Sequence, residues 1–315
     1  MTEKLVTRRA VCAMTIAATL PYLTLKALWL TGHGTGAADA AGGAVLLDTV
    51  HLVGDVVTAG LEVAAIALAL ALTCGWGRRV PAVLVLFPMW VGTGLLAPIA
   101  AGVPLGLAVQ AVAGGSPAPA GNGLHGWVYG CVYGGFLVQA VGLFALFPGY
   151  VRGRWPGLLR DRAASVVPGP RWAVRVAGAV AVGYAGALTL WAATGSRFAG
   201  PAGFETLAQR TYLAAGAVLV VVGVLAVAAA RRPSRVRYVA GWAGTAVIAL
   251  SGPTGVALSS DHSPQPGYVA VCLVAMLAGL VLTVLALRAL RRPDRPAGTA
   301  RALPRTVTLG SPAGR

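Results

Sequence analysis

Long apolar runs separated by short polar connections dominate the chain. The runs lie near 10–31, 45–73, 80–101, 124–147, 172–194, 209–230, 237–258 and 267–290. A helix of about 20 apolar residues, rising about 1.5 Å per residue, crosses a hydrocarbon core about 30 Å thick. The pattern therefore predicts an all-α polytopic membrane bundle of about eight transmembrane helices.

The third run is the least regular of the eight. It contains Pro81, Pro88, Pro98 and Pro104, and proline removes a backbone donor and bends a helix. The stretch 103–113 is too short to span a bilayer alone. We therefore expect a kinked helix to about residue 101, followed by an interfacial or re-entrant piece at 103–113.

Composition agrees with a chain that faces lipid. Hydrophobic residues make up 57% of the 315 residues and charged residues only 11%, whereas a soluble domain carries about 25% charged residues. The net charge of +16 raises the possibility of nucleic-acid binding. The basic residues, however, form short clusters between apolar runs, which is the pattern of membrane topology signals. We expect no nucleic-acid partner.

The basic clusters predict the orientation of the helices. With the N-terminus inside, all but three of the 25 lysines and arginines fall on the inner side, the exceptions being Lys26, Arg197 and Arg210. This asymmetry predicts a multi-pass protein of a bacterial plasma membrane with both termini in the cytoplasm. The same clusters lie where anionic lipid headgroups would be attracted at the cytoplasmic face.

Weak internal similarity predicts two parallel four-helix halves. "PYLTLKALWLTG" (21–32) parallels "GYAGALTLWAATG" (183–195), "WVGT" (90–93) parallels "WAGT" (242–245), and "WVYGC" (127–131) parallels "YVAVC" (268–272). Four spans per half give both halves the same orientation, as in parallel transporter repeats. The predicted organisation is a first half 1–147, a basic linker 148–171, a second half 172–290 and a disordered basic tail 291–315.

"PYLTLKALWLTG", the later "LFPMWVGTGLLAP" and the arginine-rich composition resemble a large set of uncharacterised multi-span membrane proteins of actinobacteria. The resemblance covers much of the first half. It implies a bacterial source and carries no defined activity, cofactor or site residue.

One face of the second predicted helix is polar. Asp48, His51, Asp55, Thr58 and Glu62 fall within an arc of about 80° at 100° per residue. The stripe extends about 21 Å along the helix axis. Ionisable side chains in a membrane span are costly and often functional, so this stripe is the main candidate site.

The first predicted helix carries a matching face with a single charge. Thr15, Thr19, Tyr22, Lys26 and Trp29 share one side, and we expect Lys26 to pair with Asp48 or Asp55. The pair could simply lock two helices together, with Lys26 extending toward the outer interface. One lysine cannot neutralise three carboxyls, so at least one of them is expected to be protonated or to line water.

The histidines suggest a second kind of chemistry. Asp48, His51, Asp55 and His125 are weak candidate ligands for a metal, and His51 with His125 could flank a haem. Tyr129 and Gln139 share a face of the fourth helix with His125 and are secondary candidates, as are Tyr22 and Thr58. Gly126, Gly130 and Gly134 have the spacing of a close helix-packing face. Trp29 near an outer boundary is interpreted as an interfacial anchor.

The leading hypothesis is a permease-like protein that moves a small solute or ion, with proton coupling at the facing polar sides of the first two helices. Asp55 and Glu62 would carry the proton or cation, Lys26 would balance charge, and His51 would act near an outward-opening mouth. The alternatives are an intramembrane enzyme or metal or haem protein with an outer-leaflet site, and a non-catalytic accessory subunit or sensor. No cofactor is required, and a membrane-protein partner or homo-oligomer is compatible with the pattern.

Overall fold

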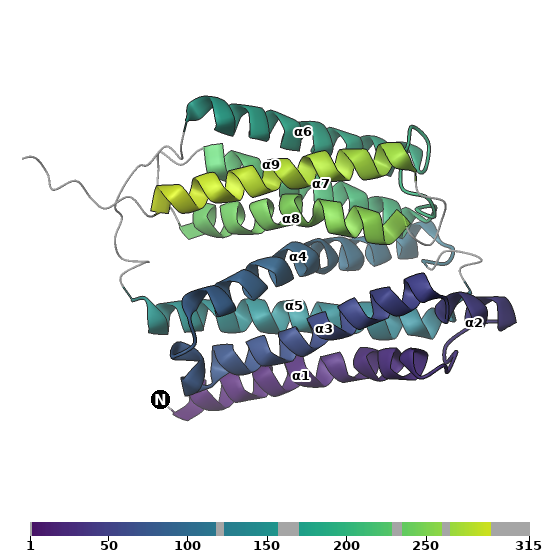
Figure 1. Ribbon diagram of the computed structural model, residues 1–315, viewed down its shortest axis with the longest axis horizontal. Helices are drawn as coiled ribbons and strands as arrows, with labels where there is room; N and C mark the ends of the chain where they lie inside the picture. The colour runs from purple at the N-terminus through teal and green to yellow at the C-terminus, as the bar shows by residue number, and fades with distance from the viewer. Residues whose placement is uncertain (1, 118–122, 157–169, 229–234, 260–264, 291–315) are drawn as a thin grey trace, which may run out of the picture.

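The computed structural model describes residues 2–117, 123–156, 170–228, 235–259 and 265–290, shown as a helical bundle in Figure 1. Most of the predicted linker 148–171 and the predicted disordered tail 291–315 lie outside these residues. The first and last turns of several helices extend further than predicted. The fourth predicted helix, expected over 124–147, continues through Pro148 to Arg154.

Within the described ranges the chain forms long helices joined by short connections. The helices are α1 (Thr2–Leu30), α2 (Ala40–Leu46), α3 (Thr49–Thr73), α4 (Ala82–Ala113), α5 (Gly126–Arg154), α6 (Arg171–Thr194), α7 (Leu207–Ala228), α8 (Arg235–Ser259) and α9 (Pro266–Leu290), with a 3₁₀ turn η1 (Gly75–Arg78).

The membrane helical bundle predicted from the sequence is confirmed. In the described part of the chain, seven helices are long and apolar enough to cross a membrane: α1, α3, α4, α5, α6, α7 and α9. The seventh predicted span, 237–258, corresponds to α8, which has 25 residues and packs along α7 and α9. It carries Arg237, Thr245, Ser251 and Thr254 and is the least apolar of the long helices after α1.

The second predicted span is interrupted near its start. The prediction of one helix over 45–73 is wrong at this end, because α2 ends at Leu46 and α3 begins at Thr49. Asp48 sits between them as the N-cap of α3, with φ −67° and ψ 150°. Aspartate is a favoured residue at this position because its side chain can accept a hydrogen bond from the amides of the first turn, although Asp48 makes no such bond. Asp48 is therefore not part of the helical stripe.

The third predicted span is one continuous helix. The expected interfacial or re-entrant piece at 103–113 is wrong, because α4 runs unbroken through Pro88, Pro98 and Pro104 to Ala113. Its 32 residues correspond to about 48 Å, which exceeds the hydrocarbon thickness and requires tilt. In Figure 1 α4 crosses the bundle diagonally.

Close packing against α7 explains why α4 continues past its prolines. A Cβ on Gly102 would lie 2.7 Å from the Tyr212 ring, and one on Gly106 would lie 2.6 Å from the Ala208 carbonyl oxygen. The Gln110 side chain then accepts a hydrogen bond from the Ala208 amide at 3.1 Å and donates to the Gly114 carbonyl at 2.6 Å. Such contacts stabilise a helix whose own ladder lacks donors.

Each set of four consecutive long helices forms a ring of contacts. In the first, α1 packs on α3, α3 on α4, α4 on α5 and α5 on α1; in the second, α6, α7, α8 and α9 follow the same order. The two rings meet where α4 packs against α7 and α8, as seen across the middle of Figure 1.

The buried faces of α1 and α6 share one register. Tyr22 and Trp29 on α1 correspond to Tyr184 and Trp191 on α6, and all four are buried. Each tryptophan donates its indole N–H to a carbonyl in the loop that follows, Trp29 to Thr35 at 2.8 Å and Trp191 to Phe198 at 3.1 Å. These matches support a duplicated origin, which stays a prediction.

The glycine face that packs α5 differs from the expected one. A Cβ on Gly126, Gly130 or Gly134 would meet no atom within 4 Å, so the prediction that these glycines pack a helix is wrong. Instead, a Cβ on Gly135 would lie 2.7 Å from the Ala18 oxygen, and one on Gly142 would lie 1.9 Å from Thr15 Oγ1. The close approach of α1 to α5 therefore depends on Gly135 and Gly142.

Candidate functional site

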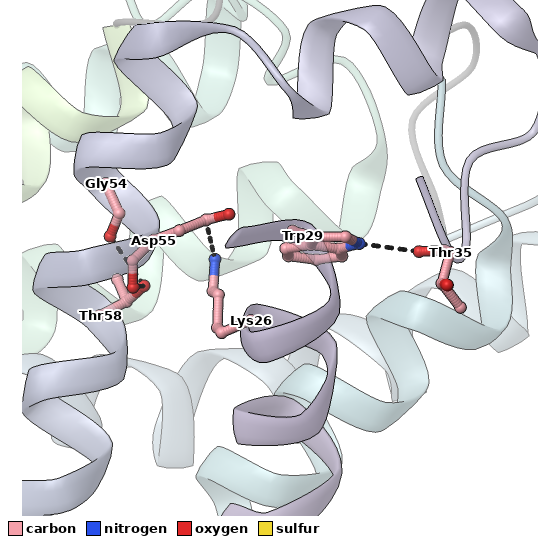
Figure 2. A network of polar contacts seen from close by, with 6 residues as sticks. All are labelled: Lys26, Trp29, Thr35, Gly54, Asp55 and Thr58. Carbon is pink, nitrogen blue, oxygen red and sulfur yellow. Dashed lines mark hydrogen bonds and ion pairs between the residues drawn. The ribbon is translucent and has the colours of Figure 1, made fainter. Parts of the chain in front are cut away.

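A buried ion pair joins α1 to α3. Lys26 Nζ lies 2.5 Å from Asp55 Oδ1, and the two side chains are only 8% and 7% exposed. Figure 2 shows the lysine reaching across from α1 to the carboxylate on α3. The predicted ion pair is thus confirmed, with Asp55 as its acidic member. Asp48 is exposed at the N-cap of α3.

Two aromatic rings enclose the lysine. Lys26 Nζ lies 4.7 Å from the ring centroid of Tyr22 and 4.7 Å from that of Trp29. Both rings are buried, so they offer the ammonium a favourable π-face in place of water. The residues follow one another along the buried face of α1 at helical spacing. The lysine is therefore held by α1 itself as well as by Asp55.

A second carboxyl lies two helical turns farther along α3. Glu62 is 3% exposed, and its Oε2 accepts a hydrogen bond of 2.8 Å from Gln139 Nε2 of α5. Gln139 is 2% exposed. Asp55 and Glu62 are seven positions apart on one face of α3, or about 10 Å along its axis. The polar line therefore runs from the α1–α3 interface to the α3–α5 interface.

The buried charges of this line do not balance. If all three groups are ionised, Lys26 supplies one positive charge against the negative charges of Asp55 and Glu62. Asp55 Oδ2 is also buried and has no hydrogen-bond partner among the described residues. A buried, unpaired charge is strongly unfavourable. The arrangement therefore favours the uptake of one proton or one monovalent cation.

Apolar residues seal the end of the line nearer the α2 loop. Trp29, Leu46 and Val128 form a buried cluster with Tyr22 and Leu25. The loop after α1 is held over this cluster by the Trp29–Thr35 hydrogen bond visible in Figure 2. The backbone also pairs Ala37 with Leu124. The buried Trp29 side chain therefore covers the ion pair, and its interpretation as an interfacial anchor is wrong.

The nearby surface depression does not lead to the polar groups. It is open and apolar, and it is lined by Leu30, Thr49, Leu52, Val53, Val56 and Val57. None of these is a member of the Lys26, Asp55 and Glu62 line. This depression therefore gives no access to the polar line.

A larger apolar cluster seals the opposite end. Its members come from all four long helices of the first half: Cys12, Leu68, Ala69, Ala71, Leu72, Val85, Met89, Leu96, Ala140, Leu143, Leu146 and Tyr150. No ionisable side chain other than Cys12 and Tyr150 is among them. The polar line is therefore enclosed on both sides.

The other sequence candidates lie at the margin of this line. Thr58 donates its hydroxyl to the Gly54 carbonyl of its own helix at 2.8 Å. His51 is half-buried one turn before Asp55, and Tyr129 is half-buried with its ring stacked on Tyr133 at 6.4 Å. His125 is the exposed N-cap of α5.

The proposed metal ligands do not converge. Asp48 and His125 are exposed at separate N-caps, while Asp55 is buried against Lys26. Among the described residues, no group of three or more His, Cys, Asp or Glu side chains could hold a metal ion.

The second half has apolar residues where the first half has the polar line. Leu188 occupies on α6 the register position of Lys26 on α1. On α7, Leu213 and Val220 are buried at the same spacing as Asp55 and Glu62. In the part of the chain that the structure describes, the polar line is thus confined to the first half.

The role of Gln139 as the partner of Glu62 was missed by sequence reasoning. Gln139 was recognised only as a polar position near His125, because nothing in a single helix says which neighbour it meets. A polar amide in an apolar run at the depth of Glu62 was the available signal.

Comparison with protein-family models, with curated proteins and with solved structures finds no match.

Proposed function

We propose that this protein is permease-like, and that it takes up one proton or one monovalent cation at Asp55 and Glu62 to couple the movement of a small solute or ion. The observation that carries the proposal is the excess negative charge of the buried line, together with the unpartnered Asp55 Oδ2. Ionisable groups inside a membrane are costly. A bound proton or cation would neutralise the excess negative charge of the line and so lower that cost.

The cation and the lysine would compete for Asp55. When a proton or cation occupies Asp55, Lys26 loses its counter-charge but keeps the π-faces of Tyr22 and Trp29 at 4.7 Å. These cation–π contacts lower the free-energy cost of breaking the ion pair. The Nζ–Oδ1 contact of 2.5 Å joins α1 to α3. Breaking it would therefore allow the two helices to move relative to each other.

The enclosed line corresponds to an occluded state in this proposal. Alternating access requires that one seal opens while the other stays closed. The seal formed by Trp29, Leu46 and Val128 is the smaller of the two. The loop after α1 closes over it through the Trp29–Thr35 hydrogen bond. We propose that this seal opens first.

Proton binding is tested directly by infrared difference spectroscopy of the purified protein in lipid. Titration should reveal a carboxyl C=O band that disappears in Glu62→Gln or in Asp55→Asn. The matched control is Asp48→Asn, which removes an exposed carboxyl from the same helix. A band unchanged in both buried variants would contradict proton uptake by this line.

Ion movement is tested in liposomes with a pH-sensitive dye and an imposed potential. The wild type should carry a proton or alkali-cation current that Glu62→Gln reduces about tenfold or more, while Asp48→Asn leaves it intact. Flux that survives both Glu62→Gln and Asp55→Asn would reject the proposal. In that case Lys26 and Asp55 act as a structural lock between α1 and α3.

A further inference from the structure

Two arginines lie side by side on one face of α5, at the end of the bundle opposite α2. A Cβ built on Gly149 would lie 3.9 Å from Arg8 Cζ, and one built on Gly153 would lie 3.2 Å from Arg78 Nη2. Gly149 and Gly153 are one turn apart, so their Cβ positions are separated by about 5–6 Å. The two guanidinium groups therefore occupy neighbouring places on the same helix.

The neighbouring backbone fixes Arg8 without neutralising it. Arg8 Nη2 donates a hydrogen bond of 2.7 Å to the Leu72 carbonyl oxygen, near the C-terminus of α3. Its Nε is buried and has no hydrogen-bond partner among the described residues. Arginine keeps its charge at every ordinary pH and has five donors, so most of its hydrogen-bonding capacity remains available.

Hydrogen bonds from α5 hold the turn that presents Arg78. Arg154 of α5 donates to the carbonyls of Gly77 at 3.0 Å and Val80 at 2.6 Å, and Tyr150 Oη donates to Gly77 at 3.0 Å. A Cβ on Gly77 would lie 1.8 Å from the Ala71 oxygen, so only glycine allows η1 to pack this closely. Arg154 is thus used in positioning the turn, whereas Arg78 is left exposed at its end.

No carboxylate is available to this pair within the described side chains. The described acidic side chains are Asp39, Asp48, Asp55, Glu62 and Glu205, and all lie in the core or toward the α2 end of the bundle. The ion pair between Lys26 and Asp55 is the only one found among the described residues. Two adjacent guanidinium groups repel each other, and an anion placed between them would remove that repulsion.

We infer that Arg8 and Arg78, over Gly149 and Gly153 of α5, form a binding site for the phosphate of an anionic phospholipid. A phosphate diester accepts hydrogen bonds from two forked guanidinium groups at once. The site lies where α3 ends and α4 begins, at the level expected for headgroups. Trp76 nearby is 47% exposed, and Val83, Leu84 and Phe87 leave an exposed apolar surface on the first turns of α4 for acyl chains.

Native mass spectrometry of the detergent-purified full chain can test this site, with phosphatidylglycerol competing against phosphatidylcholine. The wild type should retain phosphatidylglycerol preferentially, and Arg8→Gln/Arg78→Gln should weaken its apparent affinity about tenfold. Arg9→Gln/Arg152→Gln is the matched control, because it removes two exposed arginines near the same end and should weaken the affinity much less than the double substitution at the site.

Two further arms separate the alternatives. Gly153→Leu leaves the charge unchanged but places a side chain against Arg78, and it should also weaken phosphatidylglycerol binding; retained binding would overturn the site. Equal losses in both double arginine variants would mean a diffuse basic surface and would also overturn it. Displacement of the lipid by inorganic phosphate at comparable concentration would assign a soluble anion instead.

Discussion

The sharpest consequence of the structure concerns the stability of the Lys26–Asp55 pair. Removing one member of a buried ion pair leaves an uncompensated charge, which costs about 3–5 kcal/mol. Both side chains are less than a tenth exposed, so water does not screen the remaining charge. We therefore expect Lys26→Leu to lower the free energy of unfolding by about 3–5 kcal/mol.

Substitution of the acidic member of the pair should lower the free energy of unfolding by less. In Asp55→Leu the ammonium remains between Tyr22 and Trp29, each with its ring centroid at 4.7 Å. Desolvated cation–π contacts contribute about 2 kcal/mol. The expected loss is therefore about 1–3 kcal/mol.

The double substitution Lys26→Leu/Asp55→Leu should restore most of the stability. A well-packed apolar pair often replaces a buried ion pair at little or no cost. The chain itself has a buried leucine, Leu188, at the position of α6 that corresponds to Lys26 of α1. The two losses should thus be strongly non-additive, with a coupling energy of at least about 3 kcal/mol.

Reversible unfolding in bicelles, measured for the four proteins of this cycle, gives the coupling energy. Glu205→Gln, an exposed carboxyl in the loop before α7, serves as a control that should leave stability unchanged. A coupling energy below about 1 kcal/mol, similar to that of ordinary polar contacts in membranes, would refute the reasoning. It would mean that Lys26 and Asp55 are not both charged and in contact.

Four further substitutions test other parts of the structure. Gly142→Ala should destabilise the protein by about 1–3 kcal/mol, because its Cβ would lie 1.9 Å from Thr15 Oγ1. Gly130→Ala, where the Cβ would meet no atom, should be neutral or stabilising by up to about 1 kcal/mol. Thermal unfolding distinguishes the two. Gln139→Leu should cost about 1–3 kcal/mol by leaving Glu62 Oε2 without its 2.8 Å donor, and the same assay should show a smaller loss when Glu62 is also leucine. Gly77→Ala should displace η1 and make the connection between α3 and α4 more susceptible to limited proteolysis.

The sequence predicted the fold class because the dominant signal is local. Each apolar run is long enough to span a bilayer by itself, so its identity does not depend on its neighbours. The proline-rich run was misread for the opposite reason. Whether α4 continues past Pro104 depends on Gly102 and Gly106 meeting Tyr212 and Ala208 of α7, which no single segment reveals.

The candidate site was predicted in part for similar reasons. Helical periodicity placed Lys26 and Asp55 on facing sides at matching depth, and the structure joins them. Asp48 was assigned to the same stripe because the break before Thr49 has no strong sequence marker other than the aspartate itself. Gly126, Gly130 and Gly134 have a regular spacing but face open space, because spacing alone does not show which side of a helix has a neighbour.

The packing of α4 also constrains the order in which the protein can be assembled. Every close glycine approach of α4 is made to the second half: Gly94 to Ala246, Gly102 to Tyr212 and Gly106 to Ala208. During synthesis at about 5–20 residues per second, α7 would emerge on the order of ten seconds after α4. Until then the glycine face of α4 has only lipid beside it. The glycine face of α4 therefore reaches its final packing only after α7 and α8 have been inserted.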